Sequence, residues 1–399
     1  MIGASRWSAA LLLVLVAGAA GCGGGGDEPS QTPAQRATGP VEGQGSGDLQ
    51  AAGSLGFPAF ATSNTTRIGG SDPIADAAAV AQAVYPSRSV DTRPRVVTLV
   101  DDTDWRVAIS ASQLMAAPLR APILFSQGTQ LPPATAQALA LLHPVTAKEA
   151  GGAQIIRIGE TARATGYRTT DLKGADHAAL ALAIDSLHTA AAGSPSPAVV
   201  VASSEQPGYA MPAAGWAAKS GSPVLWVTRD AIPDATRIAI EAHKQPRIYV
   251  LGPATAISDQ VLQELGKLGT VRRIGDRDPV TNAIDFARFS DGSFGWNVVD
   301  PGHGLVFAST QRPQDAAAAA ALSGTGSYGP LLLLTEPNVL PPALQDFLLD
   351  IQPGYESDPV RGVYNHGWLL GDESAVTVDV QARIDTLLEI APVDRPGGS

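Results

Sequence analysis

The sequence predicts an α/β protein built from three tandem modules, each of the Rossmann or flavodoxin type with a mainly parallel sheet. Two observations carry this prediction. The motif RIGGSDP at 67–73 returns as RIGDRDP at 273–279, and a weaker copy, LKGADH, lies between them at 172–177. Apolar runs of strand length recur in step with these motifs. One unit of roughly a hundred residues is therefore used three times.

The predicted strands are apolar runs rich in β-branched residues, three in each unit. The first strand of each unit lies within 95–102, 197–204 and 304–310. The second strands lie within 121–126, 222–228 and 329–335, and the third within 154–160, 247–258 and 362–377. Short, unbroken runs of this kind are typical of strands that are buried on both faces.

Helical patterns fill the segments between these strands. Asp72 is an acidic N-cap, Pro73 stands at the first helical position, and an apolar stripe follows; Asp278 and Pro279 repeat this start. Alanine-rich runs follow the first strands at 107–117, 210–218 and 315–322, and a further helix follows each second strand. Because apolar strands alternate with helices, we expect parallel sheets covered on both faces, with right-handed crossovers.

The first residues carry an export signal. Arg6 precedes an apolar run at 8–16, which is shorter than the ~20 residues that a membrane-spanning helix needs. The run ends in small residues directly before Cys22, the single cysteine of the chain. This arrangement resembles the lipobox of bacterial lipoproteins, in which the peptide is cut before the cysteine and the cysteine carries the lipid. An ordinary secretory peptide, with Cys22 left as a free thiol, is the alternative.

The domain organisation follows from these boundaries. We expect a lipoprotein signal peptide at 1–21 and, at 22–56, a disordered tether rich in Gly, Pro and Ser that cannot bury enough apolar surface to fold. The three modules are predicted at 57–162, 163–268 and 269–391, and a disordered tail at 392–399. The lipid would hold the protein on the outer face of the cytoplasmic membrane, within reach of the cell wall.

Charge and cysteine content exclude several classes of protein. Lys and Arg total 27 and Asp and Glu total 38, so the formal net charge is −11, which argues against nucleic acid as a partner. A single cysteine excludes intrachain disulfides and zinc clusters held by several thiolates.

With these motifs, the chain resembles the cell wall binding repeat 2 family, whose members carry three tandem modules on surface proteins of Gram-positive bacteria. The family opening, Arg-[Ile/Leu]-x-Gly-x-Asp-Arg, is kept twice and is weakened at LKGAD, where Asp171 replaces Arg67 and Arg273. A central Asp of the family is kept at Asp315, while Val107 and Tyr209 replace it in the other units. The resemblance implies a pseudo-threefold arrangement of the modules and noncovalent attachment to an anionic cell-wall polymer.

The candidate binding surface lies beyond the carboxyl ends of the strands, where parallel sheets place their ligands. The polar residues there would suit sugars: hydroxyls and arginines to hydrogen-bond, and Trp105 to stack on a ring, whereas Trp216 and Trp226 are expected in the core. Alternatively, these polar residues simply solvate the loop ends. The candidates are Asp101, Asp102, Trp105, Arg106, Ser126, Ser203, Ser204, Thr228, Arg229, Ser309, Thr310, Arg312 and Thr335.

No catalytic or metal motif is recognised. The six histidines form no HExxH pair, no GxSxG elbow is present, and SGTGSYG at 323–329 lacks the Lys-Ser/Thr of a phosphate loop. We therefore expect no catalytic residues, no metal site and no cofactor. A polyanionic ligand would still need local positive charge, which Arg106, Arg229 and Arg312 could supply, or a divalent cation that bridges Asp101 and Asp102 to phosphate.

Together these observations predict a lipid-anchored, monomeric surface protein that binds a cell-wall glycopolymer without catalysis. Three weak sites on one rigid body would gain avidity along a repeating polymer. Two alternatives stay open. A solute-binding lipoprotein of a membrane transporter would show two unequal lobes joined by hinge strands, and a wall-polymer hydrolase would show convergent carboxylates in one unit.

Overall fold

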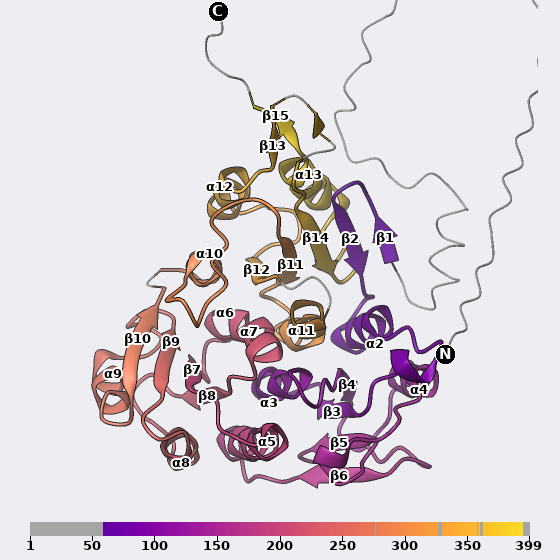
Figure 1. Ribbon diagram of the computed structural model, residues 1–399, viewed down its shortest axis with the longest axis vertical. Coiled ribbons are helices and arrows are strands. Elements are labelled where there is room, and N and C mark those ends of the chain that lie inside the picture. The colour runs from indigo at the N-terminus through magenta and orange to yellow at the C-terminus, as the bar shows by residue number, and fades with distance from the viewer. Residues whose placement is uncertain (1–58, 276, 326–328, 357, 360–361, 394–399) are drawn as a thin grey trace, which may run out of the picture. The chain divides into compact units, whose positions relative to one another are not determined.

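The computed structural model describes residues 59–393, except 276, 326–328, 357 and 360–361 (Figure 1). The predicted signal peptide, the lipidation site at Cys22 and the tether lie outside the described residues, as does the tail from 394 onward. No helix in the described part of the chain has the length and apolar character that crossing a membrane requires.

Three sheets with one strand order make up the fold. The first has the order β4-β3-β5-β6, the second β8-β7-β9-β10, and the third β12-β11-β14-β2, with β1 added at its edge. Every pairing within these three sheets is parallel except that of β1 with β2. The predicted α/β class with mainly parallel sheets is therefore confirmed. The strands are β1 (Ala59–Ala61), β2 (Thr65–Ile68), β3 (Val97–Asp101), β4 (Ile123–Ser126), β5 (Ile155–Ile158), β6 (Thr169–Leu172), β7 (Ala198–Ser203), β8 (Val224–Val227), β9 (Arg247–Leu251), β10 (Thr270–Ile274), β11 (Gly304–Ser309), β12 (Leu331–Leu334) and β14 (His366–Leu370).

The fourth strand of each sheet comes from the motif that opens the next repeat. Strand β6 pairs with β5, but helix α5 (His177–Ala192), which follows β6, packs on β8 of the second sheet. Likewise β10 pairs with β9, while α10 (Pro279–Arg288) packs on β12. Strand β2 pairs with β14 of the third sheet, and α2 (Pro73–Val84) packs on β4 of the first. The chain therefore connects the three sheets cyclically, and the predicted boundaries at 162/163 and 268/269 fall before strands that complete the preceding sheet.

The helices that follow the first strands meet at the centre of the described structure. These are α3 (Trp105–Ala111) with η2 (Ser112–Met115), α6 (Pro207–Ala210) with α7 (Pro212–Ser220), and α11 (Asp315–Thr325). Helices α3, α7 and α11 pack against one another between the three sheets (Figure 1). Alanines 316–321 of α11 are all buried, and their small side chains let the helices approach closely.

The remaining helices cover the outer faces of the sheets. Helices α4 (Pro133–Leu142), α8 (Asp234–Ala242) and α12 (Pro342–Asp350) follow the second strands, and α9 (Asp259–Leu265) and α13 (Val378–Leu388) follow β9 and β14. The first sheet differs, because β5 runs into β6 through a loop at 159–168 that contains no helix. Shorter elements are η1 (Val90–Thr92), η3 (Lys148–Ala150) and the pair β13 (Gly354–Tyr355) and β15 (Ala391–Pro392).

The predicted helix starts are confirmed in atomic detail. The Asp72 side chain accepts a hydrogen bond from the backbone N–H of Ala75, and Asp278 accepts one from Val280. Asp176 of the middle repeat does the same for Ala179. Each carboxylate satisfies a backbone donor that the first turn of a helix leaves unpaired, and it also interacts favourably with the helix dipole.

Candidate functional site

The loops at the carboxyl ends of the three first strands converge and interlock. Arg106 of the first loop donates to the carbonyl oxygen of Ser204 in the second (2.5 Å), and Gln314 of the third donates to that of Asp102 in the first (2.8 Å). Gly208 takes the equivalent position in the second loop, where a Cβ would lie 4.0 Å from Thr310 of the third. Two of the three loops therefore use this position to hydrogen-bond the next loop around the cycle, and in the remaining loop the position is a glycine that faces Pro279 and Thr310. The structure brings these predicted site segments together, but it uses them to join the modules.

Most of the predicted polar candidates bond to the backbone beside them. The Asp101 carboxylate accepts from the N–H groups of Thr103 (2.9 Å) and Gly128 (2.5 Å). The Ser203, Thr228 and Ser309 hydroxyls accept from backbone N–H groups two or three residues further on, Ser204 donates to the Val227 carbonyl, and Ser126 is fully buried. Thr310 and Thr335 are half-buried. These contacts favour the alternative in which such residues stabilise loop ends.

Asp102 lies directly beside Asp101 among these candidates. Burial and the neighbouring charge of Asp101 raise its pKa. The charge of Asp101 therefore opposes ionisation of Asp102, which is the electrostatic setting that a bridging cation would relieve. Within the described residues, however, no group of three or more His, Cys, Asp or Glu side chains could hold a metal ion.

Trp105 was expected at the surface as a stacking platform, and the structure buries it. Its side chain packs edge-on against Trp226 at a centroid distance of 5.4 Å, and only 8% of the residue is exposed. The guanidinium of Arg106 covers its ring at 4.6 Å. A sugar cannot reach this ring face, because tryptophan and arginine already occupy it. The expectation that Trp216 and Trp226 lie in the core is confirmed.

The arginines expected to supply surface charge are differently placed. Arg229 is exposed and pairs with Asp230 at 2.9 Å. Arg312 lies inside a cluster with Asp76 of α2 and Asp315 of α11, both fully buried. Its guanidinium is therefore used to join the first and third repeats and is not free to bind a polymer.

The two carboxyls beside Arg312 share one environment. Burial raises the pKa of Asp76 to about 6, and burial together with the charge of Asp76 raises that of Asp315 well above its usual range. Because burial opposes two adjacent negative charges, these raised pKa values indicate that one of the two carboxyls keeps its proton near neutral pH. Sequence reasoning missed Asp76, although a carboxyl within the apolar stretch of a helix was a visible signal.

A guanidinium group holds the loop that follows the third strand of each sheet. Arg273 on β10 donates to the carbonyl oxygens of Gly252 (2.7 Å) and Ile257 (2.8 Å). Arg67 on β2 donates in the same way to Gly371 (3.1 Å). The arginine of the repeat motif is thus a structural clamp on its neighbouring loop.

In the first sheet this clamp comes from the adjacent strand. Arg157 on β5 donates to the carbonyl oxygens of Thr161 and Ala162 and to Oδ2 of Asp171 on β6 (2.8 Å). Asp171 is the register partner of Arg157 and stands where Arg273 stands in the second sheet. The clamp has moved one strand across the sheet, which explains why Asp171 replaces the motif arginine.

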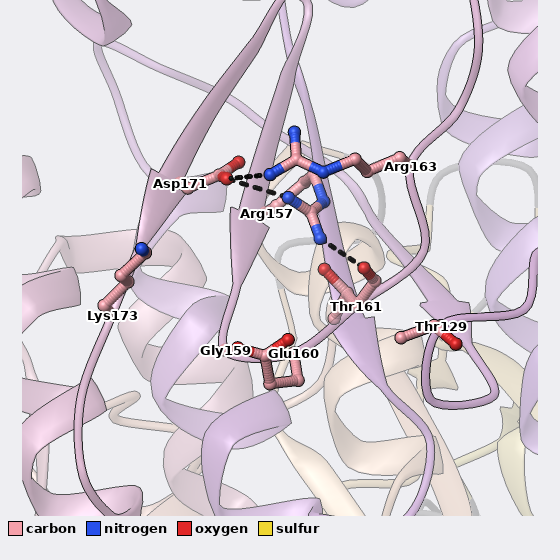
Figure 2. A pocket seen from close by; sticks show the side chains of 8 residues that line it. All are labelled: Thr129, Arg157, Gly159, Glu160, Thr161, Arg163, Asp171 and Lys173. Carbon is pink, nitrogen blue, oxygen red and sulfur yellow. Dashed lines mark hydrogen bonds and ion pairs between the residues drawn. The ribbon is translucent and has the colours of Figure 1, made fainter.

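A pocket of about 370 Å³ opens at the carboxyl ends of β5 and β6 (Figure 2). Oδ2 of Asp171 pairs with two neighbouring guanidinium groups, 2.8 Å from Arg157 and 3.0 Å from Arg163. Neither these residues nor the others around the pocket are among the predicted binding residues. The lining residues are Thr129, Arg157, Gly159, Glu160, Thr161, Arg163, Asp171 and Lys173. The departure of LKGAD from its sister motifs was the sequence signal that could have pointed here.

Comparisons with known proteins agree with the repeat and the fold. The family model of cell wall binding domain 2 (CWB2) matches residues 172–262, which is the middle repeat, whose opening motif departs most from the family pattern. No curated protein matches the sequence. Cwp6 from Clostridium difficile has a similar structure, with a TM-score of 0.64 and 17% identity over 82% of this chain and 48% of that one.

Cwp8 from Clostridium difficile is similar to a comparable degree, with a TM-score of 0.62 and 14% identity over 86% of this chain and 54% of that one. This chain therefore spans about half the length of the two solved structures. At such identities the likeness shows the fold alone. Residues 172–262 thus match cell wall binding domain 2 within a three-sheet α/β fold that this chain shares with Cwp6 and Cwp8.

Proposed function

We propose that this protein binds a cell-wall glycopolymer noncovalently and without catalysis, while a lipid on Cys22 holds it outside the cytoplasmic membrane. One observation carries the proposal: a single strand order is repeated in three sheets that are connected cyclically. The cell wall binding domain 2 match on the middle repeat supplies the class of ligand. The resemblance of the repeat motifs to that family supports the same ligand for the flanking repeats.

The cyclic arrangement favours a polymer over a small solute. A solute-binding lipoprotein needs two lobes that close on one cleft, whereas here three sheets of equal order pack around α3, α7 and α11. Three modules with the same strand order would offer a repeating polymer more than one surface to bind, so the polymer could engage several modules at once. The second and third contacts then form at high effective concentration, which raises the overall affinity.

The carboxyls of the described structure do not favour hydrolysis. Asp76 and Asp315 are fully buried and held by Arg312, so no substrate reaches them. Glu160 and Asp171 both line the pocket, but Asp171 is paired with two guanidinium groups. A hydrolase would need two accessible carboxyls placed on either side of a bond.

Cosedimentation with purified cell walls tests the proposal. Residues 23–399, which retain the mature chain without the lipidated cysteine, should sediment with walls and should stay in solution after acid or hydrofluoric extraction of secondary polymers. Equal sedimentation with extracted and untreated walls would contradict a secondary polymer as ligand. Membrane anchoring is checked separately, since a Cys22→Ser variant should be released from the membrane fraction.

A further inference from the structure

We propose that the pocket at the ends of β5 and β6 binds an acidic sugar residue, a uronate or a phosphosugar, of the glycopolymer. This inference rests on the proposed function, because it names the ligand class and one place of contact. The pocket lies where open parallel sheets bind ligands, beyond the carboxyl ends of their strands. Its volume of about 370 Å³ is at the small end of ligand pockets, which suits one or two sugar rings.

The departures of the first sheet from its two sister sheets gather at this pocket. Asp171 replaces the motif arginine, and the clamp has moved to Arg157. Lys173 stands where Gly69 and Gly275 stand in the other sheets.

The glycine positions show why a lysine is possible in this sheet alone. Gly69 has a φ of +125°, and a Cβ there would lie 2.0 Å from Oδ1 of Asp76. Gly275 has a φ of +78°, and a Cβ there would lie 2.2 Å from Oδ1 of Asn282. In the first sheet Leu180 takes the place of these polar residues, so the chain can carry a side chain at position 173.

The wall of the pocket also departs from the repeat. In the other sheets the third strand is followed by α9 or α13, each capped by a hydroxyl, Ser258 or Thr377. In the first sheet the chain turns directly into β6 through the loop at 159–168, which contributes Gly159, Glu160, Thr161 and Arg163 to the pocket. Loss of a helix and gain of two cations therefore coincide at one place.

The chemistry of the lining suits an acidic sugar. Arg163 and Lys173 are exposed and can approach a carboxylate or phosphate, while Asp171 holds one end of the Arg163 guanidinium at 3.0 Å. The Thr161 residue is only 1% exposed, and its hydroxyl has no hydrogen-bond partner among the described residues. A buried hydroxyl without a partner is costly, so a ligand oxygen that reached it would be favoured. Glu160 adds an acceptor for sugar hydroxyls.

Ligand titration tests this assignment directly. Residues 23–399 are titrated with glucuronate, glucose 1-phosphate and the neutral methyl glucoside, and binding is followed by saturation-transfer difference NMR. We expect one or both acidic sugars to bind and methyl glucoside to bind more weakly. Lys173→Gln and Arg163→Gln should each weaken the acidic sugar by about tenfold, the loss expected for one charge-assisted contact.

Matched controls separate a local effect from a change in overall charge. Arg168 lies on the same loop but outside the pocket, and Lys244 is an exposed lysine of the second repeat. Arg168→Gln and Lys244→Gln should leave binding unchanged. Equal losses for pocket and control variants would overturn the assignment, as would equal binding of methyl glucoside.

The same variants in the wall assay distinguish the two proposals. Weaker sedimentation of Lys173→Gln than of Lys244→Gln would support the pocket. If the unaltered chain sediments with walls but all variants sediment equally, the pocket assignment fails and wall binding stands. If the unaltered chain does not sediment at all, wall binding fails, and the titration alone decides whether the pocket takes acidic sugars.

Discussion

Two substitutions should return the arginine clamp of the first sheet from β5 to β6, the strand that corresponds to β10 of the second sheet. Asp171→Arg places a guanidinium at the position that Arg273 holds in the second sheet, and Arg157→Val gives its neighbour an apolar side chain like Val250 there. In the second sheet that arrangement binds two loop carbonyls. We expect the double variant to bind the corresponding carbonyls of Gly159 and Ala164.

The magnitude follows from the contacts of Arg157. Its side chain is 7% exposed and donates to two carbonyl oxygens and to Asp171. Asp171 keeps its pairing with Arg163, but two loop carbonyls lose their donor at about 1–3 kcal/mol each, so Arg157→Val alone should lower the free energy of unfolding by about 2–6 kcal/mol. Asp171→Arg alone sets two guanidinium groups side by side and should cost about 2–4 kcal/mol. The double variant should recover at least about 2 kcal/mol relative to the sum of the two.

Urea unfolding of residues 23–399 at pH 7, followed by circular dichroism, measures all four forms of this double-mutant cycle. The slope of the free energy against urea should stay constant across the cycle, so that midpoints can be compared. Losses that simply add in the double variant would show that the clamp cannot move between strands. That result would refute the claim that Arg157 and Arg273 stabilise their sheets in the same way.

Three further predictions concern buried groups. Burial raises the pKa of Asp76 to about 6, so the stability that this carboxyl contributes is present below about pH 4 and is lost as the pH rises through 6. The Asp315→Asn variant should lose less stability between pH 4.5 and pH 7.5 than the unaltered chain, as measured by urea unfolding at the two pH values. Burial opposes protonation of His243, but the Asp185 carboxylate, 2.8 Å away, outweighs it and raises the pKa. Its stabilisation should therefore be present below about pH 6.5 and fade at higher pH, and His243→Gln should remove that dependence. Gly69→Ala should lower the free energy of unfolding by about 1–3 kcal/mol, because φ is +125° and the methyl group meets Asp76; an unchanged urea midpoint would contradict this.

The fold was predictable because each repeat shows local sequence patterns that are typical of helix starts and buried strands. Asp72 and Asp278 mark helix starts by composition alone, and the structure confirms both as N-caps. The buried strands are unbroken apolar runs, and such runs separated by helices leave a parallel sheet as the consistent solution. The fourth strand was not predicted, because Arg67-Ile68 and its counterparts are too short and polar to show strand character.

The candidate site was less predictable because it depends on contacts between distant segments. The carboxyl ends of the first strands do converge, but only the structure shows that Arg106 and Gln314 use their polar groups to join neighbouring loops. Trp105 follows an acidic loop and yet packs on Trp226, more than a hundred residues away. Polarity along the chain therefore identified the loops but not which of their side chains remain accessible.

Each sheet takes its fourth strand from the next repeat, and this arrangement affects how the protein would bind the proposed polymer. A repeat excised at 163–268 would keep β6 without its partner β5 and would keep β9 without its partner β10. It would therefore expose unpaired edges on both β6 and β9. Strand β2 joins the third sheet and α2 packs on the first, so the two ends of the described chain are tied through the same cycle. Modules linked in this way cannot move independently, as beads on a flexible chain would. The binding sites that we propose for the modules would therefore be held at fixed separations, and avidity should depend on whether the spacing of sugars along the polymer matches those separations.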